Sequence, residues 1–128
     1  MDEKIEKRLK IEGIELNRWK ISGDLTFNSI SDALDRGEEL FFDKNNNSLR
    51  AILSESTPAI FDLSEVRETD SAGLSLLIEW IGFFHKENIG KAIFENIPKQ
   101  IHSMAEINEI LPLLDGSYNS ESKNSSSE

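Results

Sequence analysis

The stretch 61-FDLSEVRETDSAGLSLLIEW-80 joins an apolar segment to a helical pattern, with Asp70 and Ser71 at the change. Before it, residues 59–64 (AIFDLS) form a short, mostly apolar run, as in a strand buried in a sheet. After it, side chains recur at the three- and four-residue spacing of one helix face: Leu74, Leu77, Ile78, Ile81 and finally His85. The stretch therefore predicts a strand, a short loop and a helix.

The flanking segments extend this alternation of strands and helices. Residues 11–27 alternate loosely between apolar and polar, which predicts one or two strands, and a helix is expected over about 29–42. Residues 91–96 (KAIFEN) have the pattern of another short strand, and Pro98 opens a further helix. The order predicts an α/β fold with helices packed on a sheet.

The 128 residues suit a single domain. We expect a charged N-terminal extension at 1–10, the domain at 11–114, and a disordered Ser/Asn-rich tail at 115–128, which has little to bury. The N-terminus lacks the apolar core of a signal peptide, and no run approaches the ~18 apolar residues of a membrane span. We therefore expect a protein that is neither exported nor inserted.

Composition excludes several function classes. A net charge of −10 argues against a general nucleic-acid binder, and the absence of cysteine excludes disulfides and thiolate metal sites. The two histidines, His85 and His102, are scattered, so we expect no bound metal. No glycine-rich phosphate loop and no Gly-x-Ser-x-Gly motif are present, so we expect neither a cofactor nor catalysis.

Two interpretations of Asp70 and Ser71 stay open on the residues alone. Either side chain is a favoured helix cap, which needs no further function. Alternatively, the positive end of the helix suits an anion, so Ser71 carries a phosphate or meets a polar group of a partner. Asp70 would oppose such a phosphate by its like charge.

The same helix carries a second apolar stripe, formed by Ala72, Leu76, Trp80 and Phe83. One explanation is that a neighbouring helix or the 43–57 segment covers this stripe. The other is a docking surface beside Ser71, with Trp80 and Phe83 as aromatic anchors. The docking hypothesis predicts these partner-binding residues: Asp70, Ser71, Ala72, Gly73, Leu76, Trp80 and Phe83.

The pattern Asp62-Leu-Ser64-x-Val66-x-x-x-Asp70-Ser71-Ala-Gly73-Leu74-x-Leu76-Leu77 resembles the STAS domain family, the fold of the anti-sigma factor antagonists. The resemblance covers roughly residues 19–114 and is strongest over 60–80. It implies a mixed sheet of four or five strands with helices packed on one side. It also implies a non-catalytic protein that acts through binding.

Within that family, 96-NIPKQIHSMAEINEILPLL-114 is most similar to the MlaB-like proteins, small cytoplasmic subunits of bacterial phospholipid-transport ABC complexes. This implies that the chain docks on the transporter's ATPase subunit near Ser71 and, through it, joins the permease. It would then lie in the cytoplasm, at the inner membrane only through the complex. The chain departs from these proteins in a longer 43–57 segment and in Ser71, where they commonly carry Thr.

The resemblance also supports an alternative function. In STAS antagonists of anti-sigma factors, the hydroxyl residue after the Asp is the phosphosite controlled by a kinase, and this position is Ser71 here. Phosphorylation would add a charge of about −1.5 to −2 and block partner binding.

Overall fold

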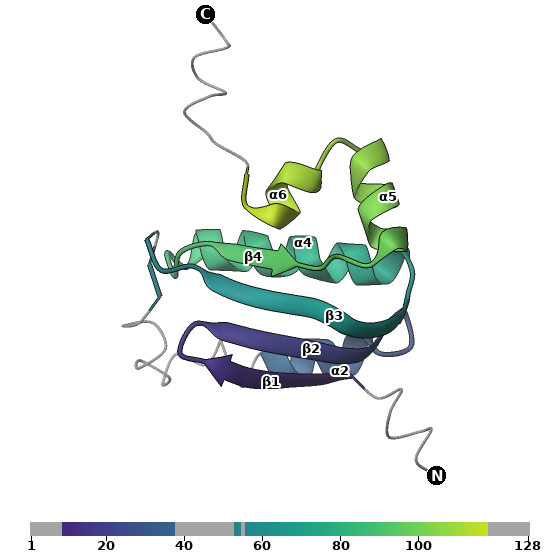
Figure 1. The fold of residues 1–128 in the computed structure, drawn as a ribbon, viewed down its shortest axis with the longest axis horizontal. Helices are drawn as coiled ribbons and strands as arrows, with labels where there is room; N and C mark the ends of the chain where they lie inside the picture. Colours follow the sequence, from purple (N-terminus) through teal and green to yellow (C-terminus); the bar gives the residue numbers. More distant parts are fainter. Residues whose placement is uncertain (1–8, 38–52, 55, 118–128) are drawn as a thin grey trace, which may run out of the picture.

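A computed structural model describes residues 9–37, 53–54 and 56–117 of the chain. One mixed sheet of four strands forms its centre, in the order β1 (Lys10–Glu15), β2 (Arg18–Leu25), β3 (Ala59–Thr69) and β4 (Ala92–Glu95) (Figure 1). The β1 and β2 strands are antiparallel, whereas β2, β3 and β4 run parallel. The predicted α/β fold with a mixed sheet is confirmed.

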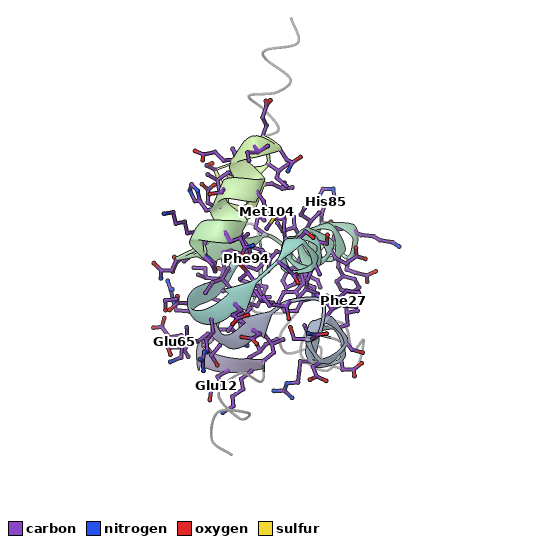
Figure 2. The ribbon with its side chains drawn as sticks, turned by 90° about the vertical axis from the view of Figure 1, so that its right-hand side faces the viewer. Glu12, Phe27, Glu65, His85, Phe94 and Met104 are labelled. Carbon is purple, nitrogen blue, oxygen red and sulfur yellow. The ribbon has the colours of Figure 1, made fainter. Side chains whose placement is uncertain are left out.

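Four helices accompany the sheet: α2 (Ile30–Gly37), α4 (Ser71–Lys86), α5 (Lys99–Ile107) and α6 (Leu111–Asp115). The α2 and α4 helices lie side by side on one face of the sheet, as predicted (Figure 2). The α5 and α6 helices lie beyond β4, at the edge of the sheet (Figure 1).

Phe61 on β3 is the centre of an aromatic core between the sheet and the helices. The centre of its ring lies 5.5 Å from the ring centre of Trp19 on β2 and 5.3 Å from that of Phe94 on β4. On α4, the ring centre of Trp80 lies 5.5 Å from that of Phe61, and the ring centre of Phe84 lies 6.3 Å from it. Burying a large apolar side chain contributes about 1.5–3 kcal/mol, so Trp80 and Phe84 contribute strongly to the packing of α4 on the sheet.

The opposite face of the sheet is polar and carries cross-strand bonds. Glu12 and Glu65 lie on this side, away from α2 and α4 (Figure 2). Arg18 donates from Nη1 to Glu95 Oε1 at 2.6 Å, and this hydrogen bond raises the pKa of the guanidinium. Asn96 donates to Asp62 Oδ1 at 2.9 Å, and this bond lowers the pKa of the carboxyl. These contacts tie β2, β3 and the end of β4 together.

Two sequence-based details of the β3–α4 region are corrected. The strand predicted at 59–64 continues to Thr69, so Asp70 alone separates it from α4 instead of a loop. Irregular pairing with β2 lets β3 continue, with Gly23 opposite Val66 and Leu25 opposite Thr69. His85 does not continue the core stripe, because it is exposed and Phe84 is buried instead.

Other predictions are met in part or lie outside the described residues. The helix expected at 29–42 is present as α2 up to Gly37, and 38–42 lie outside. Most of the 43–57 segment, the first eight residues of the N-terminal extension and residues 118–128 of the tail also lie outside. Among the described residues, the first strand begins at Lys10 and the last helix ends at Asp115.

Candidate functional site at the start of helix α4

Asp70 caps α4 and ties it to the loop that follows β2. Its Oδ1 accepts from the backbone amides of Ala72 at 2.9 Å and Gly73 at 3.3 Å. Its Oδ2 accepts from the backbone amide of Phe27 at 3.0 Å. Two of the helix amides that an anion would need are therefore already used by the protein. Capping accounts for Asp70, and the start of α4 is no ready anion site.

Gly73 brings the first turn of α4 directly against the end of β2. A Cβ at this position would lie 2.4 Å from the carbonyl oxygen of Leu25, so only glycine fits without a backbone shift. The Asp70 amide donates to the same carbonyl at 3.3 Å. Gly73 is buried, so it positions the helix and offers a partner no surface.

Ser71 is the first residue of α4 and is exposed. Within the described residues its hydroxyl forms no hydrogen bond to the protein, in contrast to the neighbouring Asp70. A hydroxyl in this position is open to a polar group of a partner or to a kinase. Its backbone is fixed by the capped turn, so the hydroxyl is presented from a defined place.

Phe27 is the site residue that sequence reasoning missed. Its side chain is 78% exposed, and its backbone is held by Asp70. It lies beside α2 and α4, on the helical side of the sheet (Figure 2). The surrounding loop is ordered by Ser29, whose Oγ accepts from the Thr26 amide at 3.0 Å and donates to the Asp24 carbonyl at 2.7 Å. The available signal was an aromatic residue two positions before Ser29, the residue that precedes α2.

The prediction that the second stripe of α4 forms a docking surface is wrong for its central residues, because these residues are buried. Leu76 is 3% exposed and Trp80 is fully buried. Trp80 packs against Phe61, and a Cβ on Gly37 of α2 would lie 3.2 Å from its Nε1 atom. The neighbouring helix therefore covers this stripe, which was the alternative explanation. Ala72 and Phe83 are half-buried.

Within the described residues, no group of three or more His, Cys, Asp or Glu side chains is placed to hold a metal ion. Over that same part of the chain, every helix is too short or too polar to cross a bilayer.

Comparison with known proteins shows a relation in structure. No model of a protein family matches the sequence, and no curated protein matches it either. Among solved structures, the anti-sigma factor antagonist SpoIIAA in its unphosphorylated form is similar, with a TM-score of 0.59 and 14% sequence identity. The match covers 82% of this chain and 84% of that one. The chain has a STAS-type fold. At this identity the likeness concerns the fold alone. In this fold Ser71 is the exposed first residue of α4.

Proposed function

We propose that this chain is a non-catalytic STAS module that binds a protein partner through Ser71 and Phe27. The observation that carries the proposal is their common attachment to Asp70. This residue directly precedes Ser71 and accepts the Phe27 amide at 3.0 Å. A polar group and a 78% exposed aromatic side chain are thus presented from one rigid point. Interfaces commonly concentrate their binding energy in such aromatic anchors.

The charge of the surrounding surface indicates the partner's character. Asp24 lies near the end of β2 that leads to Phe27, Glu68 lies near the end of β3 that leads to Asp70, and the Glu68 amide donates to Asp24 Oδ1 at 3.3 Å. Together with the chain's net charge of −10, these carboxylates favour a partner with an apolar recess bordered by basic residues.

The partner we favour is the ATPase subunit of a phospholipid-transport ABC complex, which would link the chain to the permease. The support is the similarity of residues 96–114 to MlaB-like subunits, within a chain whose residues 60–80 resemble the STAS family. The module would support assembly or ATPase activity by binding one state of the ATPase more tightly than the other, because only differential affinity shifts an equilibrium. The chain would then lie at the cytoplasmic side of the inner membrane through this complex.

A second candidate function is that of an anti-sigma factor antagonist switched by phosphorylation of Ser71. The structural similarity to SpoIIAA, solved in its unphosphorylated form, favours it. A phosphate on Ser71 would lie beside the Asp70 carboxylate, which already occupies the Ala72 and Gly73 amides. The added charge of about −1.5 to −2 would therefore stay at the surface, where it would repel acidic groups and be costly to bury in an apolar recess of a partner.

Affinity purification from native cells distinguishes these functions. Tagged wild-type protein is compared with Ser71→Glu and with Ser75→Glu, a matched control one turn along the exposed side of α4. We expect wild type and Ser75→Glu to recover ABC ATPase and permease subunits, and Ser71→Glu to lose them. Mass spectrometry of Ser71 accompanies each sample.

The other outcomes are equally informative. Recovery of a kinase or anti-sigma factor, with phosphate on Ser71, would contradict the transporter function and support the function of a phosphorylation-controlled anti-sigma factor antagonist. Retention of every partner by Ser71→Glu would contradict a binding surface at Ser71. Equal loss from the Ser75→Glu control would show that any added charge on α4 disturbs the complex.

A further inference from the structure

One side of α2 carries apolar residues at helical spacing and faces α4. Gly37 is buried, and a Cβ there would lie 3.2 Å from Trp80 Nε1, which fixes the direction of this side. One turn earlier, Leu34 lies on the same side and is 40% exposed, and Ile30 before it is half-buried. Phe27, three residues before Ile30, is 78% exposed and lies beside both helices (Figure 2). The α4 side of α2 therefore keeps apolar surface in solvent.

The side of α4 that faces α2 is also apolar. Leu76 and Trp80 are buried there, and residues three or four apart share one side of a helix. Ala72, four residues before Leu76, and Phe83, three residues after Trp80, lie on this side and are half-buried. The α2–α4 seam is the strip formed by Phe27, Ile30, Leu34, Ala72 and Phe83. Along α2 it is about 12 Å long, because this helix has 8 residues with a rise of about 1.5 Å each.

The rim of the α2–α4 seam is acidic. Asp35 on α2 and Glu79 on α4 are exposed, and neither forms an ion pair with any residue of 9–37, 53–54 or 56–117. Arg36, the one cation in the sequence of α2, comes two residues after Leu34 and therefore lies on the opposite side of that helix. Together with the net charge of −10, these carboxylates favour a partner whose apolar residues are flanked by basic ones.

We propose that the partner lays an amphipathic helix along the α2–α4 seam, with apolar residues at i, i+3 or i+4 and i+7 and basic residues on its flanks. The proposal rests on the proposed function, because Phe27 belongs to both surfaces, and it adds the kind of element that the partner contributes. The backbone groups within α2 and α4 are bonded inside their own helices, so side chains must supply the contact. A helix that sets its apolar side into a groove binds in this way. Two turns of it match the length of the seam.

The test titrates the full chain with a labelled peptide, Lys-Leu-Ala-Lys-Leu-Leu-Ala-Lys-Leu-Ala-Ala-Leu-Lys-Ala, followed by NMR. Its leucines form one helical stripe with lysines beside it. We expect saturable binding, with shift changes centred on the amides of Ile30, Leu34 and Phe83. A scrambled peptide of the same composition keeps the charge but lacks the stripe, so it should bind about tenfold more weakly.

Variants of the chain locate the contact. Leu34→Ser should weaken peptide binding about fivefold, because apolar burial is lost. Its control is Ile107→Ser, which removes an 80% exposed apolar side chain from α5 and should leave binding unchanged. Glu79→Lys should weaken binding about threefold. Glu65→Lys makes the same charge change on the opposite face of the sheet and should have no such effect (Figure 2).

The seam and the Ser71 contact can fail separately in the affinity purification. Loss of partners by Ser71→Glu and by Leu34→Ser, with retention by Ile107→Ser, would support a helix on the seam. Loss by Ser71→Glu with full retention by Leu34→Ser would leave the proposed function intact but contradict the seam as a docking surface.

Several results with the peptide would overturn the proposal. Equal binding of the scrambled peptide, or equal losses in Glu79→Lys and Glu65→Lys, would reduce the contact to unspecific charge attraction. Shift changes centred on β1 or α5 would place it elsewhere. Sedimentation of the free chain as a dimer that Leu34→Ser disrupts would assign the seam to a second copy. Absence of saturable binding would show that the seam does not accept such a helix.

Discussion

The first turn of α4 and its middle are held in different ways. The first turn is fixed by polar and steric constraints, the Asp70 cap and the contact of Gly73 with Leu25, and it leaves Ser71 exposed. The middle is fixed by aromatic packing, with Trp80 fully buried against Phe61. The start of α4 therefore presents Ser71 to a partner, whereas the buried aromatic residues in its middle stabilise the fold. Mutations in the two regions should therefore separate binding from folding.

The largest effect is expected from a pair of aromatic truncations. Trp80→Ala should lower the free energy of unfolding by about 3–5 kcal/mol, because it leaves a cavity in the core. Phe27→Ala should change it by less than about 0.5 kcal/mol, since the Phe27 ring is already in solvent, but should weaken partner binding. Urea unfolding of both variants measures the contrast. Similar destabilisation by both would remove the distinction between the two regions.

A pair of glycine substitutions on α4 should give the next effect. Gly73→Ala should lower the free energy of unfolding by roughly 2–3 kcal/mol, because the new Cβ meets the Leu25 carbonyl. Gly82→Ala has no atom within 4 Å of its Cβ, so it should stabilise by up to about 1 kcal/mol through helix propensity. Thermal and urea unfolding provide the measurement. A stabilising Gly73→Ala would show that the first turn tolerates displacement.

The smallest effect concerns the Asp70 cap. Asp70→Ala should cost about 1–2 kcal/mol of unfolding free energy and speed amide exchange at Ala72 and Gly73. Asp70→Asn keeps one acceptor oxygen for these amides but cannot accept from Phe27, so its cost should be intermediate. Exchange rates and urea unfolding check both variants. Equal losses in the two would indicate that the negative charge, rather than the hydrogen bonds, supports the turn.

Sequence patterns predicted the alternation of strands and helices and the place of Asp70 and Ser71 because these depend on local spacing and capping chemistry. They did not predict which face of α4 is covered. Leu76 and Trp80 lie on the second apolar stripe of α4, and both are buried. Because α2 comes from a distant part of the chain, spacing within α4 could not show that α2 packs against this stripe. Phe27 was missed because the alternation over 11–27 assigned it to a strand, whereas β2 ends at Leu25 and leaves Phe27 exposed in the loop that follows.

The parallel pairing of β2 with β3 also has a consequence for the order of folding. Asn17 and Pro58, 41 residues apart, are joined by a hydrogen bond of 2.9 Å from the Asn17 side chain to the Pro58 carbonyl. The chain must close this loop before the central pair of strands forms, so folding should be slower than for a protein with local contacts. Closure entropy grows only logarithmically, by about 0.6 kcal/mol for each doubling of loop length. Outside α2, the connection between β2 and β3 can therefore gain residues at little thermodynamic cost.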